Sequence, residues 1–338
     1  MKSRLILVLA LIACVYSCNK DDAEPKLLNM KVYRMPDKSD YKVGETLNLS
    51  GICVMMYYEK HRIETVFFEE LSSNGLVCTP ANGTTMSLST NTLKIVHTKS
   101  NQSVEVDLFV YEPTVTDYDG NVYGVVKVGS QLWMASNLKV THYPNGSPIP
   151  MVFDNNSSGS SNDEWAALAP DAKAICFLNE DSESQYGALY TWSAAIGDAT
   201  TGSSTKPSNL QGVCPDGWHL PSNPEWWELK DYIDNVLYTQ YGNSLKSTSG
   251  WYNNGNGSDI YGFSALPAGI RDRESGNFLK QTTMARWWSA TGGGTISYTN
   301  EIGAFNFYLT SSSNVFEAGG AMDGNSASNG FSVRCVKD

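Results

Sequence analysis

Residues 214–228 read CPDGWHLPSNPEWWE and hold a cysteine, a histidine, three tryptophans and three acidic groups. Asp216-Gly217 indicates a tight turn, and Ser222 followed at the third position by Glu225 is a capping-box pattern. The apolar residues that then recur at helical spacing are Trp226, Leu229, Ile233 and Val236 or Leu237. The stretch therefore predicts a turn, a short extended segment and a capped amphipathic helix.

The same stretch also has a catalytic interpretation, with His219 as the base and Cys214 as the nucleophile. The sequence supplies no third group that would orient the histidine. A buried, hydrogen-bonded His219 is the favoured interpretation, and a Cys/His dyad or a ligand contact are the alternatives. His142 is the other histidine of residues 113–338 and has no evident partner, so two histidines exclude a three-histidine iron site.

The first seventeen residues have the features of a cleaved signal peptide. Lys2 and Arg4 precede the apolar run 5–15, whose 11 residues are fewer than the ~20 of a membrane-spanning helix. The run leads into Val15-Tyr16-Ser17-Cys18, which resembles the lipobox of bacterial lipoproteins. That resemblance implies cleavage before Cys18 and lipidation of its thiol, which would anchor the chain to the outer membrane.

Residues 18–25 are an expected acidic tether. Lys20-Asp21-Asp22 resembles the export signal of surface lipoproteins in Bacteroidetes-type bacteria, and this implies display on the outside of the cell. A plain solvated linker, with the protein on the inner leaflet of the outer membrane, is the alternative.

The mature chain is strongly acidic. Loss of Lys2 and Arg4 leaves 22 basic against 35 acidic residues, a net charge of −13. Nucleic acid and anionic lipid require clustered Lys and Arg side chains, so neither is an expected partner. Cations and neutral sugars are compatible with this charge.

Tryptophan divides the chain into two expected domains. All nine tryptophans follow residue 130, and residues 26–112 contain none. A single core seldom grows past ~250–300 residues, so we expect one domain at 26–112 and a second at 113–338.

Residues 26–112 indicate an all-β domain, because short apolar or alternating runs are separated by Gly, Asn and Ser. The stretch YKVGETLNLSGICVMMYYE (41–59) resembles the bacterial immunoglobulin-like domains of group 3, which act as spacers and adhesion modules. The resemblance implies a β-sandwich. The expected strands are 27–33, 47–52, 53–58, 65–68, 93–97 and 104–111.

Residues 113–338 carry a series of motifs. They are DGNVY (119–123), VKVGSQLWMASNL (126–138), YGALYTW (186–192), QGVCPDGWHLPSNPEW (211–226), LKSTSGW (245–251), YGFSALPAGIRD (261–272), WWSAT (287–291) and GFSVRCVKD (330–338). In this order they resemble the Fibrobacter succinogenes major paralogous domain over essentially all of 117–338. The resemblance implies an α+β fold like that of C-type lectins and formylglycine-generating enzymes, with few helices and many loops.

Two local features of this domain follow from the residues themselves. Gly129-Ser130 between apolar flanks predicts a hairpin. Phe331, Val333 and Cys335 alternate with Ser332, Arg334 and Val336, so we expect a closing strand with one buried face.

The resemblance also implies a disulfide. In C-type lectins a bridge ties the region of the first helix to the last strand, and the equivalent pair here is Cys214 and Cys335. A buried free thiol is the alternative for Cys214. Cys53 and Cys78 lie closer in sequence than the usual cross-sheet bridge of immunoglobulin domains, so their pairing is not favoured.

Other candidate sites favour structural roles. Residues 117–121 lack the spaced ligands of an EF-hand calcium loop, so a hairpin turn is favoured. The acidic cluster Glu180-Asp181-Ser182-Glu183 could ligate calcium, but a solvated loop is favoured. Trp287-Trp288 could stack on a sugar ring, but neighbouring strand positions face opposite sides, so one ring is expected in the core. We assign no catalytic residue, metal ligand or cofactor, and the ligand-binding residues stay unknown.

Together these inferences predict an all-β Ig-like sandwich followed by an α+β domain that is C-type-lectin-like or formylglycine-generating-enzyme-like. The expected function is that of a surface-exposed outer-membrane lipoprotein acting as a non-catalytic binding or adhesion module. Its ligand would be a glycan or a cell-surface protein. The alternatives are an enzyme on the formylglycine-generating-enzyme-like fold and a structural subunit of a surface assembly.

Overall fold

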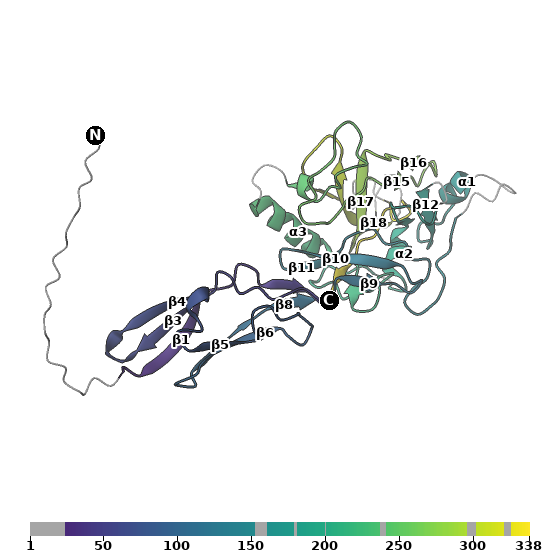
Figure 1. Ribbon diagram of the computed structural model, residues 1–338. Helices are drawn as coiled ribbons and strands as arrows, with labels where there is room; N and C mark the ends of the chain where they lie inside the picture. Colours follow the sequence, from purple (N-terminus) through teal and green to yellow (C-terminus); the bar gives the residue numbers. More distant parts are fainter. Residues whose placement is uncertain are drawn as a thin grey trace, which may run out of the picture. The chain divides into compact units, whose positions relative to one another are not determined.

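The computed structural model describes residues 24–152, 161–178, 181–199, 201–236, 241–295, 302–320 and 326–338, with the backbone alone at Ser161 and Val236. The expected signal peptide, Cys18 and residues 18–23 of the tether lie outside the described residues. Two compact units follow one another along the chain, with the boundary between Tyr111 and Glu112 (Figure 1). In the part of the chain that is described, no helix has the length and apolar character to cross a membrane.

The first unit is built of short strands. They are β1 (Leu27–Arg34), β2 (Asp40–Lys42), β3 (Cys53–Tyr58), β4 (Ile63–Phe67), β5 (Leu76–Thr79), β6 (Thr92–His97), β7 (Ser103–Asp107) and β8 (Phe109–Tyr111), with single-turn 3-10 helices η1 (Glu59–His61) and η2 (Phe68–Glu70).

Two antiparallel three-stranded sheets form this unit, in the strand orders β1-β3-β4 and β5-β6-β7, and β2 pairs in parallel with β8. Met30 and Val54 of the first sheet and Leu93 and Ile95 of the second belong to one hydrophobic core. Because each sheet turns one apolar face toward that core, the residues of β6 alternate between buried and more exposed positions. The unit is therefore a pair of sheets around a shared core.

One predicted strand of this unit is wrong. Leu47, Leu49 and Ile52 are buried as their pattern suggested, but residues 47–52 form a loop and a turn. The Leu49 N–H donates to Oδ1 of Asn82 at 2.8 Å, and the Ile52 N–H donates to the Leu49 carbonyl at 3.1 Å. Alternating burial thus arose from a loop that lies on the core and not from a sheet ladder. The short strands β2 and β5 were not predicted.

The second unit contains the helices. Its elements are β9 (Thr114–Thr116), β10 (Val122–Val128), β11 (Gln131–Met134), α1 (Ser161–Ala166), β12 (Ile175–Phe177), β13 (Ala188–Tyr190), α2 (Trp192–Ile196), β14 (Trp218–His219), α3 (Asn223–Val236), η4 (Gly242–Ser244), β15 (Ile270–Arg271), β16 (Phe278–Leu279), β17 (Met284–Thr295), β18 (Ile302–Thr310), β19 (Glu317–Gly319) and β20 (Val336–Lys337). The described chain is therefore mostly β-sheet with few helices.

A five-stranded sheet in the order β14-β20-β11-β10-β9 brings the end of the chain beside distant segments. Val336 of β20 lies opposite Trp133 of β11 on one side and opposite His219 of β14 on the other. The predicted hairpin is confirmed, since Val128 pairs with Gln131 across Gly129-Ser130. A second sheet has the order β17-β18-β19, and β12-β13 and β15-β16 are separate pairs.

The core of this unit is aromatic. The α3 face that carries Trp226, Leu229 and Ile233 is fully buried, which confirms the predicted amphipathic helix. The ring of Trp226 lies 4.6 Å from that of Trp133 and 5.5 Å from that of Phe307, measured between centroids. Such pairs each add about 0.5–1.5 kcal/mol beyond the area they bury. They attach α3 firmly to both sheets.

One expectation about this core is wrong, and one alternative does not hold. Residues 330–336 are buried on both faces, and only Val336 and Lys337 form a strand, because β-bridges to Tyr190, Arg271 and Trp287 enclose the segment. One ring of Trp287-Trp288 was expected in the core, and in fact both are buried, so the alternative that the other ring stacks on a sugar does not hold. Strand β17 is covered on both sides, so its alternation does not separate core from solvent.

Candidate functional site

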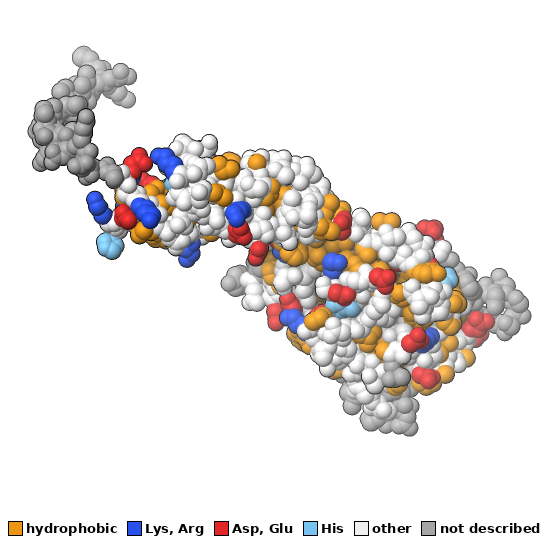
Figure 2. Space-filling model, turned by 90° about the horizontal axis from the view of Figure 1, so that it is seen from below, with side chains coloured by type: hydrophobic (Ala, Val, Ile, Leu, Met, Phe, Trp, Pro, Cys, Tyr) orange, Lys and Arg blue, Asp and Glu red, His pale blue; other side chains and the backbone are white. Residues whose placement is uncertain are grey.

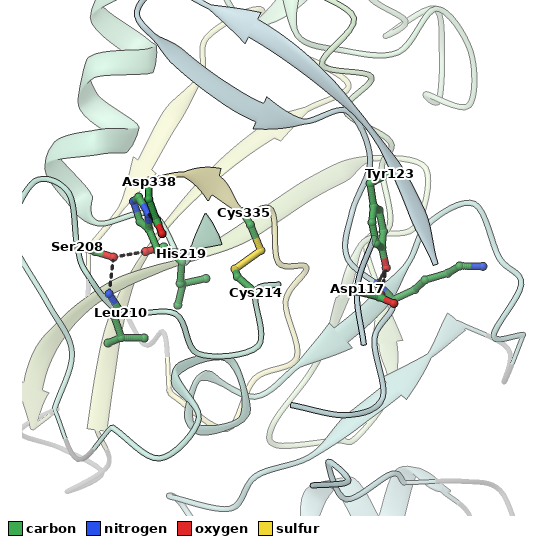
Figure 3. The surroundings of a disulfide bond; sticks show 10 residues. Asp117, Tyr123, Ser208, Leu210, Cys214, His219, Cys335 and Asp338 are labelled. Carbon is green, nitrogen blue, oxygen red and sulfur yellow. Dashed lines mark hydrogen bonds and ion pairs between the residues drawn. A yellow bond between two sulfur atoms is a disulfide. The ribbon is translucent and has the colours of Figure 1, made fainter. Parts of the chain in front are cut away.

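The disulfide between Cys214 and Cys335 fixes the segment before α3 to the end of the chain (Figure 3). Their Cα atoms are 5.9 Å apart across a sequence separation of 121 residues, and neither side chain is exposed. The expected bridge is therefore present, and the alternative of a free thiol at Cys214 does not hold. On the chain-entropy model, closing a loop of this length stabilises the fold by roughly 4–5 kcal/mol.

His219 lies close in sequence to this bridge, on β14, and is 2% exposed. Its Nε2 is 2.6 Å from Oε1 of Glu225, and its Nδ1 is 2.6 Å from Oδ1 of Asp338. Burial by itself lowers the pKa of His219, but the hydrogen bonds and negative charges of Glu225 and Asp338 outweigh burial and raise it. Both ring nitrogens are thus engaged, and the ring favours the protonated, doubly donating form.

Glu225 is the centre of this network and is 4% exposed. Besides binding His219 through Oε1, it accepts hydrogen bonds at Oε2 from the Ser222 N–H at 2.8 Å and the Ser222 hydroxyl at 2.9 Å. The Ser208 N–H donates to the same oxygen at 3.2 Å. One half of the predicted capping box is therefore formed. The other half differs, because the Ser222 hydroxyl binds the carboxylate and not the N–H of Glu225.

These contacts decide what the cluster can do chemically. The Cys214 sulfur has no proton to lose while it is bonded to Cys335, so it cannot act as a thiolate nucleophile. His219 needs a free ring nitrogen to act as a base, and both of its ring nitrogens are hydrogen-bonded to carboxylates. The arrangement ties β14, α3 and the last residues of the chain together, which is the structural interpretation of the opening stretch.

A pocket of about 240 Å³ lies beside this cluster, and His219 contributes to its wall. The other residues that line it are Asn209, Gln211, Asp216, Gly217, Trp218 and Asp338. The wall is made mostly of amide and carboxylate side chains, so the pocket is polar.

The arrangement of motifs matches a known family. The profile described as the Fibrobacter succinogenes major domain matches residues 126–337, which is more than half of the chain. The protein belongs to the Fibrobacter succinogenes major domain family. No curated protein matches the chain. The matched range includes Cys214, His219, Glu225 and Cys335, whereas Asp338 lies just outside it.

Just before the range that matches the family, Asp117 and Asp119 form hydrogen bonds within the protein. The Asp117 carboxylate accepts the Asn121 N–H at 2.9 Å and the Tyr123 hydroxyl at 2.6 Å, as Figure 3 shows for the tyrosine. Asp119 Oδ1 lies 2.6 Å from Nδ1 of His142, so the expectation that His142 lacks a partner is wrong. Within the described residues, no three His, Cys, Asp or Glu side chains are grouped to hold a metal ion.

Sequence reasoning missed the buried cations of the family domain. Arg334 is fully buried, and its guanidinium donates to Oδ1 of Asn137 at 2.7 Å and to the carbonyls of Met134 and Phe263. Lys246 is 1% exposed and donates to the Ser313 carbonyl at 2.8 Å. The alternation of residues 331–336 predicted that Arg334 faces solvent, so no local sequence pattern could have indicated its burial.

Proposed function

We propose that this protein is a surface-exposed outer-membrane lipoprotein that works as a non-catalytic binding or adhesion module. In this proposal residues 26–112 are an immunoglobulin-like stalk, and residues 113–338 are a C-type-lectin-like head. The lipid on Cys18 holds the protein in the membrane.

The observation that carries the proposal is the state of the Cys214 and His219 side chains. Cys214 and His219 are the nucleophile–base pair that the sequence suggested. Cys214 is bonded in a disulfide, and both ring nitrogens of His219 are hydrogen-bonded to carboxylates. These bonds support a rigid structure, and they leave neither side chain free to take part in a catalytic reaction. A rigid frame that carries long loops favours binding, because binding residues are found disproportionately on loops held by a scaffold.

The architecture of each unit is compatible with these roles. Two three-stranded sheets around one core support a sandwich for the first unit. In the second, a disulfide joins the segment before a helix to the residues before the last strand, which supports the lectin-like assignment. On the face seen in Figure 2, acidic and basic side chains are interspersed, which supports a partner other than nucleic acid.

The anchoring part of the proposal is tested by metabolic labelling. Palmitate should label the natural chain and should not label Cys18→Ala, which should be released into the periplasm. Protease added to whole cells should remove the head, and replacing Lys20-Asp21-Asp22 with alanines should protect it. Equal labelling of both chains would contradict the anchor, and a natural chain resistant to protease would contradict outward display.

The binding part is tested on cells. Cells that display the chain should adhere to neighbouring or host cells more than cells carrying Cys18→Ala, and added purified full chain should compete for this adhesion. Equal adhesion of the two cell types would contradict the proposed function. A glycan array with the same protein then separates sugar ligands from protein ligands.

A further inference from the structure

Two adjoining pockets on the second unit share one wall. One has a volume of about 310 Å³ and the other about 240 Å³, and Asn209 and Gln211 line both of them. Ligand sites in proteins are typically ~300–1,000 Å³ and use a small number of fixed polar groups. We refer to the two pockets together as the amide groove. The lining side chains that matter below are Tyr143, Asn145, Asp198, Asn209, Gln211 and Asp216.

The shared wall is held rigidly from beneath. The buried Ser208 hydroxyl donates to the Leu220 carbonyl at 2.6 Å and accepts the Leu210 N–H at 3.2 Å (Figure 3). The Leu220 N–H donates a hydrogen bond to the Leu210 carbonyl at 2.9 Å. Since Ser208 and Leu210 are buried, the alternate residues Asn209 and Gln211 are the exposed ones. Their amides are therefore presented by a backbone that needs no ordering when a ligand binds.

The amides of this wall still have hydrogen-bonding capacity. Gln211 uses Nε2 to donate to Oδ1 of Asp216 at 2.8 Å, which fixes the side chain and leaves its carbonyl oxygen as an acceptor. Asn209 adopts a left-handed backbone conformation with φ +53°. Within the described residues, nothing bonds to the side-chain amide of Asn209. It can therefore both donate and accept.

Two further residues that line the larger pocket, Tyr143 and Asn145, are also held in place. Tyr143 is 7% exposed, and its hydroxyl donates to the Ala194 carbonyl of α2 at 3.2 Å. The exposed Asn145 accepts two hydrogen bonds from Ser147 at Oδ1, from the N–H at 2.9 Å and from the hydroxyl at 2.6 Å. The amide nitrogen of Asn145 makes no hydrogen bond with Ser147 and is available to donate one to a ligand. The groove is thus lined both by apolar residues such as Ile196 and by the amide side chains of Asn145, Asn209 and Gln211.

Charge restricts what can enter. The charged side chains that line the two pockets are the carboxylates of Asp198, Asp216 and Asp338, together with His219, which is already bonded to Asp338. Two cations lie near these carboxylates: Lys173 is 2.7 Å from Asp198, and Lys337 lies over the ring of Trp218. Within the described residues the Asp216 carboxylate forms no salt bridge, so an anionic group placed beside it would be repelled. An apolar ligand would leave the amides without partners, at a cost of about 1–3 kcal/mol each.

We propose that the amide groove binds a neutral oligosaccharide by direct hydrogen bonds with Asn209, Gln211 and Asn145. Sugar hydroxyls donate and accept at once, which matches an acceptor on Gln211, a donor on Asn145 and an Asn209 amide that can do both, beside carboxylates that accept. The proposal rests on the function proposed above and gives it a ligand class and a place on the second unit.

The test uses the full chain purified in detergent and a panel of neutral tetrasaccharides of glucose, galactose, mannose and N-acetylglucosamine. Titration calorimetry should find at least one that binds, and Gln211→Ala and Asn209→Ala should each weaken it at least tenfold. Asn253→Ala is the matched control, because Asn253 is also exposed and has φ +51°. It should leave the affinity unchanged.

Folding is controlled separately. Asn209→Gly removes the amide while keeping a residue that tolerates positive φ, so it should reproduce the loss of affinity at an unchanged unfolding midpoint. Unchanged affinity in Asn209→Gly and Gln211→Ala would overturn the site, and failure of every neutral tetrasaccharide to bind would overturn the ligand class. In both cases the adhesion of displaying cells still decides the proposed function independently.

Discussion

The imidazole of His219 and the carboxylate of Glu225 join strand β14 to the first turn of helix α3 across 2.6 Å. The same carboxylate also accepts the N–H of Ser222, the residue that precedes the helix. One buried side chain therefore begins the helix and orients the histidine. Its negative charge near the helix N-terminus is further favoured by the helix dipole.

Glu225→Ala should destabilise the protein strongly. The change leaves His219 buried without the partner of Nε2 and leaves the Ser222 N–H without its acceptor. Breaking a buried pair on one side typically costs about 3–5 kcal/mol. Urea denaturation measures this cost. Glu228→Ala, three residues along the same helix, should cost less, because the Glu228 side chain is 24% exposed against 5% for Glu225; equal losses would contradict the role given to Glu225.

The His219 network should also make stability depend on pH. The pKa of His219 is raised in the folded protein above its ordinary value of about 6.5. Its stabilising contribution is therefore complete below about pH 6.5 and is lost as the pH rises through the folded pKa. Thermal midpoints of the natural chain and of His219→Gln should differ most at low pH and converge above the folded pKa. A difference that grows toward alkaline pH would contradict this sign.

The Cys214–Cys335 bridge should account for a large part of the stability of the second unit. Cys214→Ser and Cys335→Ser should each lose roughly 4–5 kcal/mol, and the double variant should lose no more than either one, because all three lack the same bridge. Cys176→Ser serves as the control for a buried cysteine outside the bridge. Non-reducing peptide mapping provides the direct check: Cys214 and Cys335 that react with an alkylating agent in the folded, oxidised chain would refute the bridge.

The features that the sequence predicted well are local ones. Helix α3 was recognised because its cap and its apolar spacing are determined by residues within one stretch, and the hairpin at Gly129-Ser130 has the same property. The partner of His219 in Asp338 is 119 residues away, and no local pattern connects them. Alternation along a strand separates core from solvent only when one face of the sheet is exposed. Both faces are covered here, so the alternation wrongly predicted an exposed Arg334.

The amide groove shows the same limit. Asn209 and Gln211 lie in a polar-looking loop segment, where the sequence gives no reason to prefer them over other amides. Their exposure follows from the bonds that bury Ser208 and Leu210, and these bonds depend on the Leu220 backbone that β14 positions. A loop conformation that is set by tertiary contacts cannot be predicted from secondary-structure propensity or from hydrophobic periodicity.

Arg334→Lys should be destabilising although it conserves the charge. A lysine offers one ammonium in place of the planar fork, so it cannot reach Asn137 and the carbonyls of Met134 and Phe263 together. Each buried acceptor left without a donor costs about 1–3 kcal/mol. Arg62→Lys, in an exposed pair with Glu64, is the control and should change stability by less than about 1 kcal/mol. Similar unfolding midpoints for the two variants would show that the fork is dispensable.

Gly212→Ala should test how tightly the wall of the amide groove is packed against helix α2. Gly212 has φ +57°, and a Cβ placed there would lie 2.1 Å from the backbone carbonyl oxygen of Ala195, which cannot move aside without displacing the helix. Gly120 also has a positive φ, but a Cβ there meets nothing within 4 Å. Gly120→Ala should therefore cost about 1–2 kcal/mol for the left-handed backbone alone, and Gly212→Ala should cost about 1–3 kcal/mol more for the overlap. Urea denaturation of the two variants measures the difference, and equal costs would mean that the wall can move away from α2.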